Sequence, residues 1–155
     1  MTSINISSLL CGCTTLLITG WFDIYDLDDD SPEDADGFAD TSKRINAFIQ
    51  AEIDKGVAPN RIVLAGFSQG GAVALHVSLR SEHSLGGCVA LSTWLPFRSQ
   101  YPDVLSSAAT NLPVLQVHGD EDQVVSYPWG KGSHEVLKGL LTAPAPEFIT
   151  IEVCH

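Results

Sequence analysis

The sequence is poor in positive charge. Only 8 lysines and arginines stand against 19 aspartates and glutamates in 155 residues, which gives a formal net charge of −11 at pH 7. A surface of this sign repels nucleic acid and anionic membranes, so nucleic acid is excluded as the partner. The sequence also has no internal repeat and no apolar run long enough for an integral membrane segment. With 45% hydrophobic residues, we expect one domain around a packed core.

Cysteines are too few and too unevenly placed for a disulfide framework. There are four of them, and Cys11 and Cys13 do not form the C-x-x-C pair of zinc or redox sites. An apolar stretch over residues 4–18 has features of a secretory signal, but no lysine or arginine precedes it and serines and threonines dilute it. Reduced thiols and a cytoplasmic localisation are therefore predicted.

One segment is strongly biased, with seven acidic residues between positions 26 and 36. A calcium-binding EF-hand loop with its glycine at Gly37 would need an acid at Pro32 and a glutamate at Lys43, so the spacing rejects such a site. The composition is instead typical of a solvated loop that leads into a helix. We expect Ser31 to cap this helix and Pro32 to occupy its first position.

Strand and helix patterns alternate along the rest of the chain. Apolar residues recur at helical spacing from Phe38 to Ile53, and Gly56 stands where a left-handed cap is expected. An unbroken apolar run over 62–65 predicts a strand buried on both faces. Further strands are expected over 88–91, 114–117 and 148–153, and further helices over 70–79 and 129–141. This alternation predicts an α/β fold, a mostly parallel sheet with helices on both faces.

The segment with the most chemical content is Gly66-Phe67-Ser68-Gln69-Gly70, which directly follows the first predicted strand and directly precedes a helix. It is a G-x-S-x-G nucleophile elbow in the context that such an elbow requires. Glycines flank the serine because side chains would collide in so tight a turn, and Ser68 is presented at the carboxyl edge of the sheet. The backbone N–H of Gln69 then faces a developing oxyanion. The alternative is an ordinary strand-to-helix turn.

A nucleophilic serine needs a base, and the base needs an orienting carboxylate. In this fold they follow in the order serine, acid, histidine, each on a loop after a strand. The acid is expected after the strand over 114–117, where the residue pattern does not choose between Asp120 and Asp122. The base is expected after the last strand, at His155.

A metal site is the alternative interpretation of this loop. His118, Asp120 and Asp122 resemble a metal cluster, but a tight glycine-containing turn would aim their side chains in different directions, and no second histidine pair accompanies them. No metal and no organic cofactor is expected. The other histidines are interpreted as surface or packing residues: His76, His83 and His134.

From Trp21 onward the chain resembles the acyl-protein thioesterase and lysophospholipase (carboxylesterase) family of α/β hydrolases. The resemblance rests on four blocks in the family's order: Trp21-Phe22-Asp23-Ile24, residues 60–72, Leu91-Ser92-Thr93-Trp94-Leu95-Pro96, and His118-Gly119-Asp120-Glu121-Asp122. It implies that Ser68 is the nucleophile and that Asp122 rather than Asp120 is the acid. It also implies that the acyl channel is bordered by Trp94, Leu95 and Pro96.

The activity implied by this resemblance is hydrolysis of the thioester between a fatty acyl group and a protein cysteine. Lysophospholipids and small esters are implied as further substrates, so the expected partners are S-acylated proteins or lysophospholipid. The alternative is a truncated, catalytically silent family member that binds acyl chains or protein partners.

The resemblance also predicts where the chain departs from the family. Family members begin with several strands and a loop that supplies a second oxyanion N–H, and residues 1–20 do not match that region. The family's final helix, and the glycine before its histidine, have no counterpart near His155. We therefore expect an atypical segment over 1–20 and a partial α/β-hydrolase domain over 21–155. The strand before Ser68 would then form a free sheet edge, which favours self-association.

Overall fold

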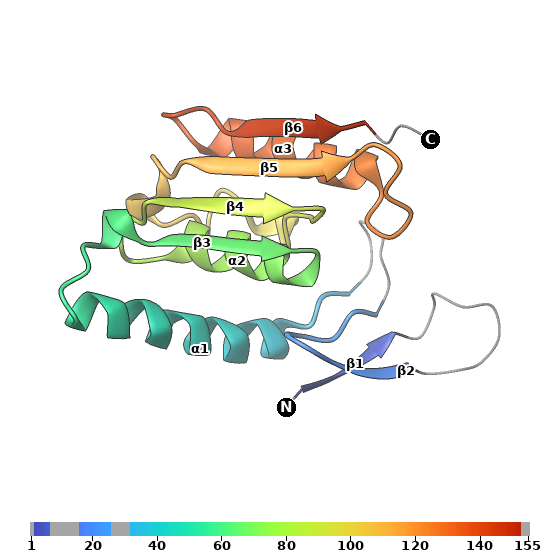
Figure 1. The fold of residues 1–155 in the computed structure, drawn as a ribbon, viewed down its shortest axis with the longest axis horizontal. Coiled ribbons are helices and arrows are strands. Elements are labelled where there is room, and N and C mark those ends of the chain that lie inside the picture. Colours follow the sequence, from blue (N-terminus) through green and yellow to red (C-terminus); the bar gives the residue numbers. More distant parts are fainter. Residues whose placement is uncertain (1, 7–15, 26–31, 153–155) are drawn as a thin grey trace.

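The structure, a computed structural model, describes residues 2–6, 16–25 and 32–152. Its centre is a four-stranded sheet in the order β3-β4-β5-β6. These strands are Val63–Phe67, Gly87–Leu91, Val114–Gly119 and Glu147–Ile151. All three neighbouring pairs are parallel, and the strands follow one another across the sheet in chain order (Figure 1). The predicted mostly parallel sheet is confirmed, and each predicted strand overlaps an observed one.

Three helices accompany this sheet: α1 (Ala35–Asp54), α2 (Gln69–Arg80) and α3 (Tyr127–Leu140). Helix α2 packs on β3 and β4, and α3 packs on β5. Both lie on the same side of the sheet, while α1 runs beside α2 near the β3 end (Figure 1). In the described part of the chain, the helices therefore cover one face of the sheet, whereas the sequence predicts helices on both faces.

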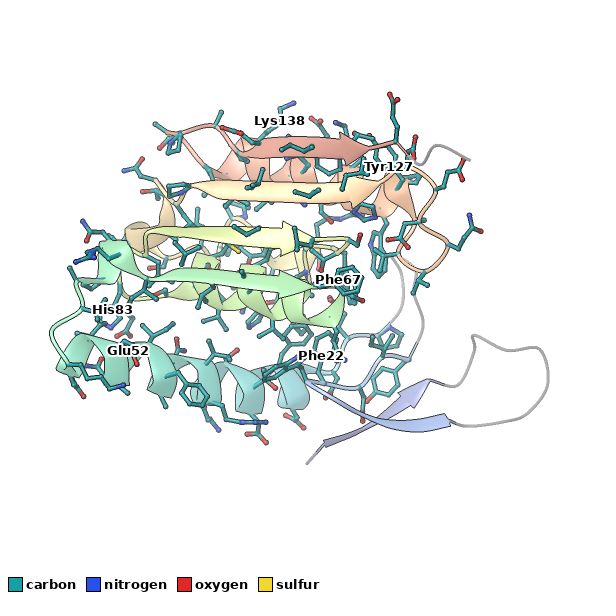
Figure 2. The ribbon with its side chains drawn as sticks, in the orientation of Figure 1. Phe22, Glu52, Phe67, His83, Tyr127 and Lys138 are labelled. Atoms are coloured by element: carbon teal, nitrogen blue, oxygen red, sulfur yellow. The ribbon has the colours of Figure 1, made fainter. Side chains whose placement is uncertain are left out.

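The other face of the sheet carries exposed apolar side chains. Phe67 at the carboxyl end of β3 (Figure 2) is 68% exposed, and Val63 on the same strand is 53% exposed. The prediction that the first strand is buried on both faces is therefore wrong. Its apolar run fits a buried strand, but only the side chains that face α2 are covered by the described residues.

Helix α1 begins later than the sequence predicts. Its N-cap is Asp34, whose carboxylate accepts hydrogen bonds from the backbone N–H groups of Gly37 at 2.9 Å and Asp23 at 2.8 Å. The prediction of Ser31 as the cap and Pro32 as the first helical residue is wrong, because Asp34 satisfies the helix start and Pro32 precedes it. Ser31 itself lies outside the described residues. The end of α1 is as predicted, with Gly56 at a φ of +92°.

Residues before the helices form a hairpin of their own. Strands β1 (Thr2–Ile6) and β2 (Leu16–Gly20) pair antiparallel in a separate two-stranded sheet. Neither pairs with β3, which is an outer strand of the four-stranded sheet in the residues described, as the sequence predicts. The division into an atypical segment 1–20 and a domain over 21–155 stays a prediction. No helix within residues 32–152 is long and apolar enough to cross a membrane.

Candidate active site

Ser68 stands at a sharp bend between the end of β3 and the start of α2. Its φ of 51° and ψ of −122° lie outside the regions that residues with a side chain normally adopt, so the surroundings must fix this conformation. The N–H of Ser68 donates to the carbonyl of Leu91 at 2.8 Å. The carbonyl of Ser68 accepts from the N–H of Gly71 at 2.9 Å and from the Thr93 hydroxyl at 2.7 Å. The bend is thus bonded to β4 and to α2, with Ser68 half-buried at its apex.

Glycines are required on both sides of the bend, though not all at the positions that the motif names. A β-carbon on Gly66 would overlap the backbone carbonyl of Gly70. A β-carbon on Gly71, one residue beyond the motif, would lie 2.8 Å from the Thr93 side chain. By contrast, a β-carbon on Gly70 would meet only Trp21 Nε1, at 3.7 Å. Gly66 and Gly71 therefore allow the close approach of strand and helix.

Gln69 opens α2, so its backbone N–H has no carbonyl one turn earlier in the helix to which it can donate. Its side chain has a role that the sequence did not reveal. The side-chain oxygen of Gln69 accepts from the N–H of Trp21 at 2.9 Å, and its Nε2 donates to the carbonyl of Phe22 at 2.6 Å. The elbow is therefore tied to the segment that enters α1, where Phe22 stacks on Phe38 with ring centroids 3.9 Å apart.

Ser68 and Asp122 follow strands that end at the same edge of the sheet. The strands β3, β4 and β5 are parallel, so their carboxyl ends lie on one side (Figure 1). One strand separates β3 from β5, which places these two strands about 10 Å apart. That separation leaves room for an imidazole between the serine and the acid.

Asp122 is the better-positioned carboxylate of the two candidates. Its Oδ1 accepts from the backbone N–H groups of Val124 at 2.9 Å and Val125 at 3.0 Å, and its side chain is only 17% exposed. Asp120 is exposed, and its backbone N–H donates to the carbonyl of Ile151 at 3.1 Å. This geometry supports Asp122 as the orienting acid, since its Oδ1 is held by the loop and Oδ2 is left for a partner.

Of the histidines, the predicted base is not among the residues that the structure describes, and the buried ones have packing roles. His155 lies outside the described residues. His76 packs against the rings of Phe38 and Phe97, with centroids 4.9 and 5.4 Å away. Burial, aided by the charge of Arg80, lowers the pKa of His76 to about 3. His134 is also buried, and burial lowers its pKa.

His118 is buried too, and its Nε2 lies 2.8 Å from the carbonyl oxygen of Val125, so this nitrogen is already engaged. Within residues 32–152 no group of three or more histidines, cysteines, aspartates and glutamates is placed to hold a metal ion. The metal interpretation of this loop therefore finds no support in the described geometry.

The residues predicted to border the acyl channel are all buried. Trp94 stacks on Trp129, with centroids 4.7 Å apart and an interplanar angle of 13°, and the N–H of Leu95 donates to Ser133 Oγ at 2.9 Å. Pro96 is fully buried beside them. These contacts fix the segment between β4 and α3, and the role of Trp94, Leu95 and Pro96 in acyl binding stays a prediction.

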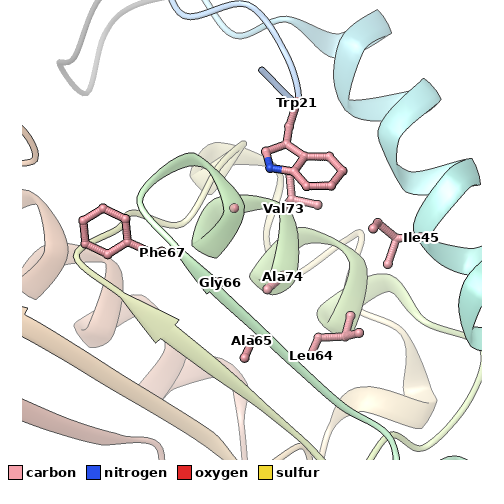
Figure 3. Close-up of a pocket in the computed structure, with 9 residues that line it drawn as sticks. Trp21, Ile45, Leu64, Ala65, Gly66, Phe67, Val73 and Ala74 are labelled. Atoms are coloured by element: carbon pink, nitrogen blue, oxygen red, sulfur yellow. The ribbon is translucent and has the colours of Figure 1, made fainter. Parts of the chain in front are cut away.

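An apolar cavity lies between α1 and the outer edge of β3 (Figure 3), away from Trp94, Leu95 and Pro96. Its volume is about 280 Å³. The lining includes Trp21, Ile45 of α1, Val73 of α2 and the β3 residues that precede Ser68. None of the predicted channel residues lines it, so the cavity and the predicted acyl channel are different places.

Residues 15–153 match the family model described as phospholipase/carboxylesterase. The chain belongs to the phospholipase/carboxylesterase family. It is similar to acyl-protein thioesterase 1 of Gibberella zeae, with 43% identity over 128 residues, covering 78% of this chain and 54% of that protein. It is similar to acyl-protein thioesterase 1 of Cryptococcus neoformans var. neoformans serotype D, with 42% identity over 125 residues, covering 79% of this chain and 52% of that protein.

Among solved structures, SOBER1 of Arabidopsis thaliana matches with a TM-score of 0.82 and 30% identity, over 90% of this chain and 67% of that one. The predicted family and the predicted α/β-hydrolase-type fold are confirmed. The chain spans about half the length of the curated relatives that it matches.

A further contact in this phospholipase/carboxylesterase chain escaped sequence reasoning. Both carboxylate oxygens of Glu33 accept from the backbone N–H of Phe97, at 2.9 and 2.8 Å. Burial raises the pKa of Glu33, while the bond from Phe97 and the nearby Arg80 and Arg98 act in the opposite direction. Glu33 of the acidic segment thus anchors the backbone directly after the Trp94-Leu95-Pro96 segment. No local pattern could reveal it, because 64 positions separate Glu33 from Phe97.

Proposed function

We propose that the protein is a serine hydrolase that cleaves fatty-acyl thioesters on protein cysteines, and related acyl esters such as lysophospholipids. The observation that carries this proposal is the strained conformation of Ser68 at a strand-to-helix bend, above the carboxyl edge of a parallel sheet. The two curated relatives named acyl-protein thioesterase 1 support the thioester as the substrate class.

The mechanism that we propose is acyl transfer through Ser68. Its hydroxyl oxygen attacks the acyl carbonyl carbon while His155, oriented by Asp122, takes the hydroxyl proton. The N–H of Gln69 donates to the oxyanion of the tetrahedral intermediate. The intermediate then expels the cysteine sulfur, which receives the proton from His155. Water finally hydrolyses the acyl-enzyme by the same route, so the reaction needs neither a metal nor an organic cofactor.

The substrate and the location are parts of the same proposal. We infer that Trp94, Leu95 and Pro96 border the site of the acyl chain, where each buried methylene contributes about 0.8 kcal/mol. The partners are then S-acylated proteins or lysophospholipid. We infer a cytoplasmic location from the cysteine usage, because four unevenly spaced cysteines do not form the disulfide framework typical of secreted proteins.

Self-association is a further part of the proposal. The outer strand β3 offers backbone groups at the edge of the four-stranded sheet, and exposed apolar side chains lie on its uncovered face. An unprotected edge of this kind pairs readily with another strand. We infer that a second copy of the chain covers this edge and the exposed apolar side chains beside it in solution.

Labelling with a fluorophosphonate probe, followed by peptide mapping, tests whether Ser68 is activated. We expect label on Ser68 in the folded protein and none in Ser68→Ala. Ser92→Ala is the matched control, because Ser92 directly follows the neighbouring strand β4 and also has a positive φ, 43°. Ser92→Ala should still be labelled and should still hydrolyse a palmitoyl thioester. Folded protein without label would instead support the catalytically silent, acyl-binding alternative.

A further inference from the structure

His118 lies directly beneath the loop that carries Asp122. It points from β5 to the face of the sheet that α3 covers and is only 2% exposed. Its ring fits against α3 because Gly130 has no side chain: a β-carbon there would overlap the imidazole. The rings of Phe148 and of Tyr127, at the start of α3 (Figure 2), lie beside it with centroids 6.4 and 6.0 Å away. The orientation of the imidazole is therefore fixed by packing on several sides.

The imidazole of His118 is connected to Asp122 through one residue, Val125. Nε2 of His118 lies 2.8 Å from the carbonyl oxygen of Val125. A carbonyl oxygen only accepts, so Nε2 carries the proton of this bond. The N–H of the same Val125 donates to Oδ1 of Asp122 at 3.0 Å. One residue of the loop is therefore bonded through its carbonyl to the sheet and through its N–H to the carboxylate.

The carboxylate oxygens of Asp122 have different surroundings. Oδ1 takes the bonds from Val124 and Val125, while Oδ2 lies 3.7 Å from Nε2 of His118, which is beyond hydrogen-bond length. His118 therefore does not occupy Oδ2 with a bond of its own. It leaves that oxygen for a catalytic imidazole and acts on the acid through the loop backbone.

We propose that His118 is a positioning residue, which holds the backbone of Val125 and thereby aims the carboxylate of Asp122 at the catalytic base. The inference rests on the proposed function, because it takes Asp122 as the orienting acid. It assigns His118 neither proton transfer nor metal binding. It also accounts for a histidine in the packed layer under α3, where an apolar side chain would fill the space but could not hold the loop.

Substitutions that keep or remove the Nε2–H donor separate positioning from packing. The amide nitrogen of Gln reaches about as far along the side chain as Nε2 of histidine, so His118→Gln retains a donor for Val125. His118→Leu removes it. We expect His118→Leu to lower kcat for a thioester substrate by about 10²-fold with little change in KM, since small misplacements of catalytic groups are costly. His118→Gln should restore most of the lost kcat.

His134→Leu is the matched control. His134 is another buried histidine in the layer between sheet and α3, and its Nδ1 lies 3.0 Å from Oε1 of Gln116, two residues before His118 on β5. This bond does not touch the loop of Asp122. We expect His134→Leu to lower the unfolding temperature like His118→Leu but to leave kcat unchanged. Equal kcat losses in both variants would overturn the proposal.

A double-mutant cycle tests whether His118 acts through Asp122. In an Asp122→Asn background, His118→Leu should lower kcat little further, because the acid that it positions is already disabled. A further loss of about 10²-fold in that background would show an effect that does not pass through Asp122, and would overturn the proposal.

Amide hydrogen exchange keeps the inference separate from the proposed activity. His118→Leu should accelerate exchange at Val124 and Val125, whose N–H groups bond to Asp122, and His134→Leu should not. If the parent protein does not hydrolyse the thioester, the proposed function fails, and the exchange data alone decide whether His118 holds the loop. Unchanged exchange at both valines in His118→Leu would overturn the positioning role.

Discussion

Gly66 and Gly70 cross so closely at the bend around Ser68 that a β-carbon on Gly66 would overlap the carbonyl of Gly70. The obstacle is backbone at the junction of β3 and α2, which cannot rotate away as a flexible side chain can. The geometry of the candidate nucleophile Ser68 therefore requires a residue without a side chain at position 66.

The first prediction follows from this contact. Gly66→Ala should lower the free energy of unfolding by about 3 kcal/mol, because strand and helix must separate to admit the methyl group. Gly139→Ala is the matched control, since no atom lies within 4 Å of a β-carbon at that helical position. It should raise the free energy of unfolding by about 0.5–1 kcal/mol. Urea denaturation measures both, and similar effects in the two variants would contradict the structure of the bend.

The second prediction concerns the two aspartates after β5. Asp122→Asn should lower ester turnover by about 10⁴-fold, because an amide does not hold the catalytic histidine in the required tautomer. Asp120→Asn should have little effect, since the Asp120 side chain is exposed. Steady-state kinetics on a chromogenic ester provides the comparison. Equal losses would refute the choice of Asp122.

The third prediction concerns stability in acid. Burial lowers the pKa of His76 to about 3 in the folded protein, whereas the pKa of a histidine in the unfolded chain is near its ordinary value of 6.5. Below pH 6.5 the unfolded chain therefore binds a proton that the folded protein does not. The contribution to stability is complete above pH 6.5 and is lost as the pH falls towards 3.

His76→Phe removes this linkage and keeps a ring beside Phe38 and Phe97. Between pH 6 and pH 4 the free energy of unfolding of the parent should fall faster than that of His76→Phe by about 1.4 kcal/mol per pH unit. Denaturant titrations at a series of pH values measure the two slopes. Parallel curves would show that His76 is not held neutral.

The fourth prediction concerns the uncovered face of the sheet. Phe67→Lys should reduce both self-association and the binding of a hydrophobic dye, because it places a charge on the outer strand. Phe48→Lys is the matched control: Phe48 is also 68% exposed, but it lies on α1. Light scattering after gel filtration gives the mass, and dye fluorescence reports the apolar surface. A monomeric, dye-silent parent protein would contradict the proposed self-association.

The sequence predicts those parts of the fold that local patterns specify. Branched apolar runs mark β3 to β6, helical spacing marks α1, and Gly56 marks the end of α1, as the structure confirms. The bend at Ser68 is also predictable, because a strand, two glycines and a helix occur within a few residues.

Contacts between distant segments are not predictable in this way. Ser31 and Asp34 are both of residue types that cap helices well, and the sequence does not show that Asp34, the observed cap, also accepts from the N–H of Asp23. Glu33 bonds to Phe97 across 64 positions. An apolar run such as that of β3 shows that a strand suits a buried setting, but it does not show what covers each face. His155, the predicted base, lies outside the described residues and stays a prediction.

Helix α2 is buried at every position from Gly71 to Leu79. A helix that meets protein on all sides has no flank that can fray into water on its own. The bend that presents Ser68 leads directly into this buried stretch, so we expect it to survive heating until the whole core melts. Loss of the serine geometry and loss of the fold then become a single cooperative event.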